Sequence, residues 1–128
     1  MFSHVHVGSN DPARSKRFYD AVMAVLGGGE GVKDPERDRY FYNHDGAMLI
    51  VGKPLDGGEA TVSNGATIGF RVDSPEQGDA WVQAGVENGG TLIEDAPGIR
   101  KKTAGTLYLA YLRDPDGNKL CALKFMDR

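Results

Sequence analysis

The sequence predicts an α+β fold in which two βαβββ modules together form one curved mixed sheet. Three observations support this fold class. An alternating strand pattern near the N-terminus leads into a capped amphipathic helix, the same order restarts 63 residues later (from Pro12 to Pro75), and an Asp-Gly turn precedes the last strand of each half. A chain of 128 residues predicts one domain, 1–128, with modules at 1–57 and 65–126.

The first module is predicted to open with a strand and a helix. From Phe2 to Gly8 the pattern alternates, so Val5 and Val7 share one face of the strand. Ser9 to Pro12 offers side-chain oxygens for the first helical N–H groups and a proline for the first turn. The apolar stripe of the helix comprises Phe18, Ala21, Val22, Val25 and Leu26. The glycines from Gly27 to Gly29 end this helix.

Three short strands are predicted to complete the first module, at 30–34, 39–43 and 47–52. The dipeptide Asp45-Gly46 separates the last two, and this dipeptide is typical of two-residue hairpin turns. Residues 53–65 have the glycine- and proline-containing composition of a linker.

The second module repeats this order. Ala66 to Val72 alternates as a strand, and Asp73 to Pro75 caps a second helix that ends at Asn88 to Gly90. The remaining elements are a strand near 91–94, a loop from Asp95 to Gly105, a strand from Thr106 to Arg113, a turn from Asp114 to Gly117 and a final strand from Lys119 to Phe125.

Charge and composition disfavour several classes of partner. With 18 acidic against 15 basic residues and a formal charge of -3, the chain lacks the basic footprint that nucleic acid or an anionic membrane favours. No apolar run approaches the roughly 20 residues that span a bilayer, and the N-terminus lacks a signal-peptide pattern, so we expect a cytoplasmic protein. The single cysteine, Cys121, excludes an intramolecular disulfide.

The stretch from Tyr111 to Asn118, with Asp-Pro-Asp-Gly-Asn before an apolar strand, is the most specific motif of the chain. With the first strand carrying His4, the helix carrying Phe18-Tyr19 and the duplicated module, it resembles the vicinal oxygen chelate superfamily. That superfamily contains glyoxalases, bleomycin-resistance proteins and extradiol dioxygenases. The resemblance covers nearly the whole chain. It implies a cup where a divalent metal and a small-molecule ligand meet, and a homodimer whose cavities are often built between subunits.

The resemblance also implies four metal-ligand positions. His4 matches the first of them, and Thr67 is its equivalent in the second module. Cys121 stands where the family normally has Glu, and Ile50 is its counterpart in the first module. Because a catalytic Zn²⁺ or Ni²⁺ site needs about three protein donors and Fe prefers imidazole and carboxylate, we expect no resident cofactor. A weakened Zn, Ni or Fe site that includes His4 is the alternative.

The two histidines of the first strand are the candidates for chemistry. His4 and His6 lie two residues apart, so their imidazoles point to the same face, about 7 Å apart along the strand. We expect His4 to be catalytic, as a remnant metal ligand or a general base, and His6 to donate a hydrogen bond to substrate. The alternative is that both are polar lining without chemistry.

Four other positions are candidate substrate-binding residues: Thr67, Tyr108, Cys121 and Arg100. In the family's cup Cys121 would approach His4, either as a Cys-His pair or as inert lining. Arg100 lies in a basic loop that either closes over an anionic group or is solvated. Tyr108 and Tyr111 are three apart on a strand, so at most one of them lines a cavity.

An apolar wall is predicted in the first module. Tyr40 and Tyr42 share one strand face, as do Met48 and Ile50, and together they would suit an apolar ligand. The alternative is that these four residues belong to the core.

Two functions remain from the sequence. The first is a glyoxalase-like enzyme similar to lactoylglutathione lyase, with His4 as the base. Dioxygenase chemistry is disfavoured because the iron ligands are missing. The alternative is a metal-free protein that binds or sequesters a small molecule, as bleomycin-resistance proteins do, and a scaffold without any ligand is a third reading.

Overall fold

The computed structural model describes all residues, 1–128, as two successive modules. The first comprises β1 (His4–Gly8), α1 (Pro12–Val25), β2 (Val32–Lys33), β3 (Arg39–His44) and β4 (Ala47–Gly52). The second comprises β5 (Ile68–Arg71), α2 (Pro75–Glu87), β6 (Thr91–Leu92), β7 (Gly98–Lys102), β8 (Gly105–Arg113) and β9 (Lys119–Phe125). The predicted α+β class with two βαβββ-type modules is confirmed. Neither helix has the length and apolar character needed to cross a membrane.

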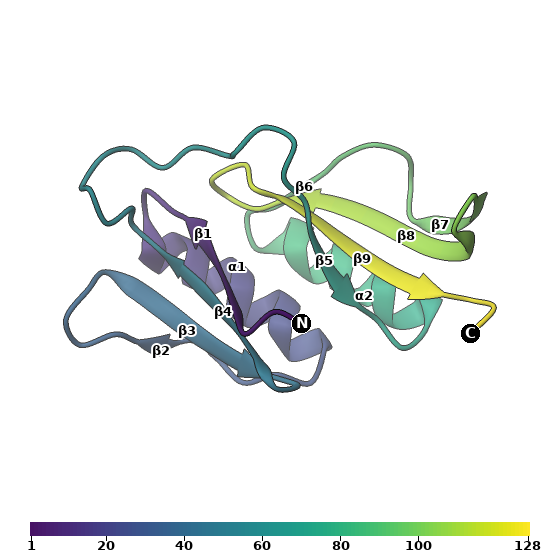
Figure 1. Cartoon of the computed structure of the whole chain (residues 1–128), viewed down its shortest axis with the longest axis horizontal. Coiled ribbons are helices and arrows are strands. Elements are labelled where there is room, and N and C mark those ends of the chain that lie inside the picture. The colour runs from purple at the N-terminus through teal and green to yellow at the C-terminus, as the bar shows by residue number, and fades with distance from the viewer.

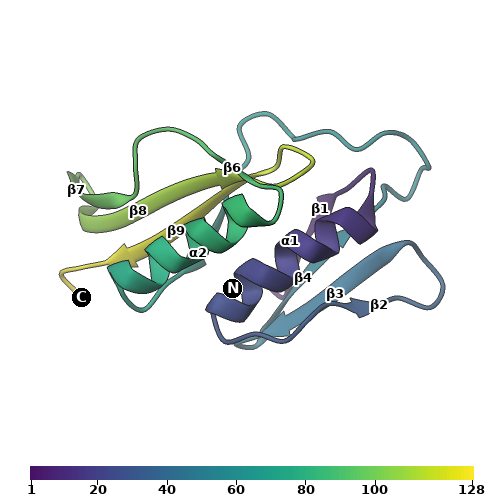
Figure 2. The ribbon, with the colours of Figure 1, turned by 180° about the vertical axis from the view of Figure 1, so that it is seen from behind.

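Each module builds its own mixed sheet, with strand orders β1-β4-β3-β2 and β5-β9-β8-β6. In each sheet the first strand runs parallel to the last strand of the module, and the other neighbours are antiparallel. Both helices lie on the same side of the two sheets (Figures 1 and 2). The opposite side carries no helix and is termed the open face.

The modules meet through their helices instead of through a continuous sheet. We expected one shared sheet, but no backbone hydrogen bond joins β1 to β5. The helices approach closely because Phe18 of α1 lies against glycines. A Cβ atom added at Gly85 would lie 3.2 Å from the Phe18 ring, and one added at Gly90 would lie 2.5 Å from it. Glycine at these positions therefore lets the two modules pack through α1 and α2.

The segment predicted as a loop from Asp95 to Gly105 contains a strand. Residues Gly98–Lys102 form β7, which pairs antiparallel with β8 and is joined to it by a tight turn that ends at Gly105, where φ is +127°. The prediction was wrong because the run from Arg100 to Lys102 was taken for a solvated loop. Charged side chains are also typical of edge strands, where they hinder pairing with another chain.

The two helices cover one face of each sheet (Figure 2), and one hydrophobic core lies between the helices and these faces. Phe18 of α1 and Trp81 of α2, equivalent in the 63-residue repeat, are both fully buried. The other members of the cluster are Val7, Tyr19, Val22, Met23, Tyr42, Leu49, Val51, Val72, Val82, Tyr108, Ala110, Leu112, Leu120 and Ala122. Because these residues come from both modules, the two modules share this core.

The Asp-Pro-Asp-Gly-Asn motif fastens the second module to the first. The buried carboxylate of Asp114 accepts a hydrogen bond of 2.6 Å from the Tyr19 hydroxyl of α1. Asp116 accepts one of 2.7 Å from Ser15, and the Asn118 amide donates to the last carbonyl of β1 at 2.9 Å. We term these five residues the inter-module clasp. The motif therefore fixes how β1 and α1 sit relative to the β8–β9 turn.

Candidate ligand-binding site

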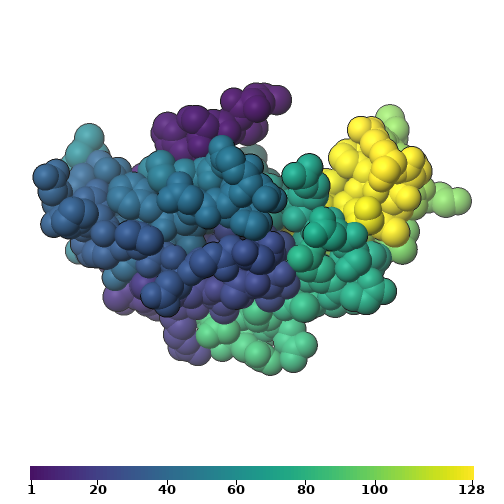
Figure 3. Space-filling model, turned by 90° about the horizontal axis from the view of Figure 1, so that it is seen from below, coloured from purple at the N-terminus to yellow at the C-terminus, as the bar shows by residue number.

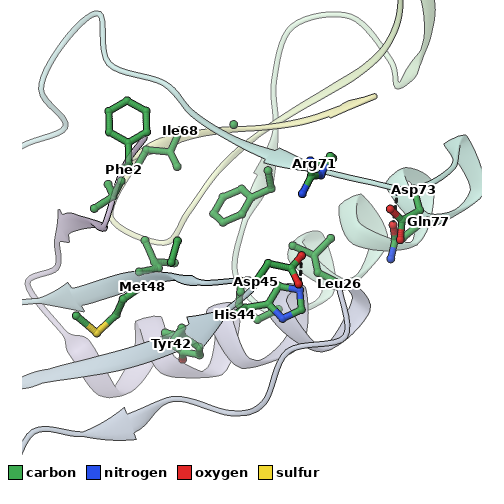
Figure 4. Close-up of a pocket in the computed structure, with 16 residues that line it drawn as sticks. Phe2, Leu26, Tyr42, His44, Asp45, Met48, Ile68, Arg71, Asp73 and Gln77 are labelled. Atoms are coloured by element: carbon green, nitrogen blue, oxygen red, sulfur yellow. Dashed lines mark hydrogen bonds and ion pairs between the residues drawn. The ribbon is translucent and has the colours of Figure 1, made fainter. Parts of the chain in front are cut away.

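A cavity of about 630 Å³ lies between the two modules, beside the unpaired edges of β1 and β5. Figure 4 shows side chains from both modules around it. Its apolar wall includes Phe2, Val5 and Met48 from the first module and Ile68 and Phe70 from the second. In the space-filling view the surface is hollowed between the blue first module and the yellow C-terminal segment (Figure 3). We term this space the inter-module cavity.

Polar groups gather at the rim of the inter-module cavity. His44 and Asp45, at the β3–β4 turn, form an ion pair with Nε2 and Oδ2 3.4 Å apart when His44 is protonated. Gln77 of α2 accepts a hydrogen bond from the Asp73 N–H at 2.6 Å and donates one to the end of α1. Arg71 at the end of β5 is exposed, and it takes part in none of the six ion pairs of the structure. Its guanidinium is therefore available to a ligand.

The two histidines lie on the open face of the first sheet. His4 pairs with Met48 and His6 with Ile50 in the parallel β1–β4 ladder, and Ile50 pairs in turn with Phe41 of β3. Directly paired residues share a sheet face, so these five side chains project to the same side. Both histidines are exposed. The prediction that His4 and His6 share a face is confirmed.

The imidazole of His6 is less basic than an ordinary histidine. Partial burial lowers its pKa below 6.5, and the positive charges of Arg39 and Arg37 lower it further. The same group can therefore accept a proton at neutral pH. The Nδ1 atom of His4 lies 2.8 Å from the Ser3 hydroxyl oxygen.

The predicted aromatic and aliphatic wall is split between two faces. Tyr42 lies in the core with its hydroxyl 2.7 Å from Asp20, and Tyr40 packs against the same core. Met48 and Ile50 project to the open face, where Phe41 supplies the aromatic ring. The register of β3 against β4 decides which of these residues lie on each face. A two-residue periodicity shows which residues share a face, but it does not show which face is covered.

Cys121 lies on the open face of the second sheet. It pairs with Tyr111 of β8 and with Gly69 of β5, and it packs with Leu107 and Leu109 in a small apolar cluster. The side chain is 4% exposed, and burial raises the pKa of its thiol. A buried protonated thiol is a poor nucleophile and a poor metal ligand, so the environment favours inert lining.

Tyr108 lies on the other side of the same sheet from Cys121. It is 1% exposed in the core, and its hydroxyl donates to Asp79 of α2 at 2.8 Å. The expected substrate contact from Tyr108 therefore does not fit its position, and Tyr111 is the tyrosine of this strand on the open face. The prediction that Tyr108 and Tyr111 lie on opposite faces of the sheet is confirmed, and neither of them lines the inter-module cavity.

Thr67 and Arg100 contribute little to a shared site. Thr67 is exposed in the residue before β5. The guanidinium of Arg100, on β7, donates hydrogen bonds to the carbonyls of Leu109 at 2.9 Å and Ala96 at 2.6 Å. These hydrogen bonds attach the segment that precedes β7 to strand β8. They also occupy N–H donors that a ligand would need.

The side chains at the four family ligand positions do not fit a divalent metal. Ile50 has no donor atom, Thr67 offers only an exposed neutral hydroxyl, and the Cys121 thiol is buried and protonated. Only His4 has a good donor, whereas a catalytic site needs about three. No group of three or more His, Cys, Asp or Glu side chains lies close enough to hold a metal ion.

Most residues of the inter-module cavity were not predicted as ligand contacts, although Tyr42 and Met48, two of the four predicted wall residues, do line it. The sequence marked Phe70 and Arg71 only as members of an alternating strand. It marked Phe2 only as the first residue of another such strand. The cavity is formed by how the two modules sit against each other, which no local pattern describes. The 63-residue repeat could have indicated that the edges of β1 and β5 face one another.

Two βαβββ modules, each with its first strand parallel to its last, define a glyoxalase-like fold. Residues 1–122 match the sequence profile of the Glyoxalase/Bleomycin resistance protein/Dioxygenase superfamily. The chain belongs to this superfamily, as its resemblance in sequence implied.

Solved structures agree with this assignment. A glyoxalase/bleomycin resistance protein from Albidiferax ferrireducens T118 is 54% identical, with a TM-score of 0.92 over 96% of this chain and 98% of that one. A glyoxalase/bleomycin resistance protein/dioxygenase family enzyme from Burkholderia phytofirmans PsJN is 21% identical, with a TM-score of 0.71 over 94% of this chain and 95% of that one. Lactoylglutathione lyase from Agrobacterium tumefaciens is 19% identical, with a TM-score of 0.65 over 96% and 92%. The last two share the fold alone. A comparison with curated protein sequences gives no significant match.

Proposed function

We propose that this chain is a small-molecule binding protein that holds an apolar ligand in the inter-module cavity without a resident divalent metal. The observation that carries the proposal is the cavity of about 630 Å³, with apolar side chains from both modules. Ligand pockets of proteins fall in a range of about 300–1,000 Å³ and are lined mainly by apolar groups, with a few polar groups that orient the ligand.

The donor set supports binding without metal. Of the family's four ligand positions, the one good donor, His4, stands on the open face with Ile50 on the neighbouring strand, and Cys121 is buried in an apolar cluster. The driving force for a ligand would therefore be removal of apolar surface from water, aided by the polar rim. This is the mode of a binding or sequestering protein of bleomycin-resistance type.

A lyase-like enzyme is the second candidate, and one observation favours it. The pKa of His6 is lowered, so a neutral imidazole stands beside His4 on the open face at physiological pH. A neutral imidazole within reach of an acidic C–H bond can act as a general base. In this candidate His4 takes the proton, as in our sequence-based expectation for a protein similar to lactoylglutathione lyase, or the neutral His6 does.

Titration with N-phenyl-1-naphthylamine, a neutral apolar fluorophore, tests the binding proposal. We expect saturable binding of one molecule per chain, with the same dissociation constant in EDTA as in added Ni²⁺ or Zn²⁺. Binding that appears only with metal would contradict the proposal, as would the absence of saturable binding.

Turnover of lactoylglutathione by the same preparation separates the two candidates. The binding proposal expects no turnover above background, with or without metal. Turnover that His4→Gln abolishes, while probe affinity stays unchanged, would favour the enzyme instead.

A further inference from the structure

A second cavity of about 450 Å³ adjoins the inter-module cavity at the end of β5. The two share Gly69, Phe70, Arg71 and Asp73 among their lining residues. On the far side the second cavity is lined by the end of β9 and by the residues that follow it, 123–125 and 128. Phe70 and Arg71 thus stand at the junction between the two spaces.

The second cavity is basic, whereas the rim of the first is mixed. Arg71, Lys124 and Arg128 line the second cavity, and Asp73 is the one acidic side chain among its lining residues. None of the three cations takes part in any of the six ion pairs of the structure. Arg71 pairs with Leu123 and Arg128 lies over the Phe125 ring, so these two cations share the open-face side, whereas Lys124 pairs with Tyr108 of the covered face. Like charges that line one cavity repel one another, and a bound anion relieves that repulsion.

Apolar and aromatic groups accompany these cations. The guanidinium carbon of Arg128 lies 4.0 Å from the centroid of the Phe125 ring, which holds the charge over an apolar surface. Leu123 and Phe70 also line the cavity. The inter-module cavity carries Asp45 in addition to the shared Asp73, and Arg71 is its one Lys or Arg side chain, so an anion is less favoured there than in the second cavity.

This inference rests on the proposed function: we propose that the ligand is an amphipathic organic anion whose apolar body occupies the inter-module cavity and whose anionic group binds Arg71 and Arg128 in the second cavity. Its chemical class is an apolar carboxylate, sulfonate or phosphate. Arg71 is the residue that selects for an anionic ligand, because it lines both cavities and its planar guanidinium can bind an oxyanion in bidentate fashion.

A pair of matched fluorophores tests this inference. 8-Anilinonaphthalene-1-sulfonate carries the same rings as N-phenyl-1-naphthylamine plus one negative charge. We expect Arg71→Gln and Arg128→Gln each to weaken binding of the sulfonate about tenfold, as is typical of a lost charge-assisted contact, and to leave binding of the neutral probe unchanged. Salt should weaken only the sulfonate.

Lys53→Gln is the control, since it removes the same charge from an exposed ammonium that lines neither cavity. It should leave both affinities unchanged, and near-UV circular dichroism should show that every variant is folded. If the neutral probe binds but Arg71→Gln leaves sulfonate affinity unchanged, this inference is overturned and the proposed function stands. Equal losses in Lys53→Gln and Arg71→Gln would overturn it too. If neither probe binds the unaltered protein, the proposed function fails with it.

Discussion

The weak basicity of His6 comes from its surroundings on the open face. Partial burial is the largest cause, followed by the charges of Arg39, Arg37 and His4, all of which disfavour the imidazolium form. Between the lowered pKa and the ordinary value of 6.5, the unfolded chain binds a proton that the folded chain does not. His6 therefore contributes stability that is complete above pH 6.5 and lost as the pH falls toward the folded-state pKa.

NMR titration of the imidazole ring protons checks this reading. We expect a midpoint below 6.5 for His6. Arg39→Gln should raise that midpoint only in part, because it removes one of the charges and leaves the burial in place. Lys53→Gln is the matched control and should not move it. A midpoint at or above 6.5 in the unaltered protein would contradict the account.

The clasp gives a second prediction at the residue scale. Tyr19→Phe removes the hydroxyl that donates to the buried Asp114 carboxylate, and should lower the free energy of unfolding by about 1–3 kcal/mol. Tyr40→Phe is the control, because Tyr40 is half-buried and its hydroxyl makes no hydrogen bond to Asp114 or to any other group of the clasp. Urea denaturation measures both. Equal losses in the two variants would show that the clasp hydrogen bond does not stabilise the fold.

Among the elements, those with strong local patterns were predictable and those set by pairing were not. The caps at Asp11 and Ser74 accept the hydrogen bonds expected of them, from the N–H groups of Arg14 and Gln77. β7 was not predictable, because its charged residues suit an edge strand and a loop equally well. Tyr108 shows the same limit: its opposite orientation to Tyr111 follows from periodicity, but its burial depends on where α2 packs.

Packing of α2 on the second sheet gives a prediction at the element scale. A Cβ atom at Gly78 would lie 2.1 Å from the Tyr108 ring, which is fully buried and bonded to Asp79. Gly78→Ala should therefore lower the free energy of unfolding by about 1–2 kcal/mol, even though alanine favours helices. Gly98→Ala adds a Cβ that meets no atom within 4 Å and should change it by less than about 0.5 kcal/mol. The same urea experiment decides, and a neutral Gly78→Ala would contradict this packing.

At the scale of the whole molecule, the open face remains uncovered by helices. It carries Phe41 and Met48 in the first sheet and Leu123 and Phe125 in the second, all partly exposed. Apolar groups gathered on one side of a small protein mark an interaction surface. We propose a homodimer that covers part of this face. Light scattering after gel filtration should give twice the chain mass of 13.8 kDa, and a stable monomeric mass would contradict the proposal.

The candidate site was predictable from the sequence only in part. The shared face of His4 and His6 and the missing donors at Ile50 and Cys121 follow from strand periodicity and from residue chemistry. The inter-module cavity does not, because it depends on how α1 meets α2 and on the clasp. Arg71 illustrates the difference. Nothing in the alternating pattern of its strand shows that this residue lies between the two cavities.

The most direct test of the account is the affinity of N-phenyl-1-naphthylamine for Gly69→Phe and Gly98→Phe in the presence of EDTA. Gly69 lines the inter-module cavity, Gly98 does not, and a Cβ atom at either position meets no atom within 4 Å. We predict that Gly69→Phe fills the cavity and abolishes saturable binding, while Gly98→Phe binds like the unaltered protein. Undiminished binding by Gly69→Phe would contradict metal-free ligand binding in the inter-module cavity.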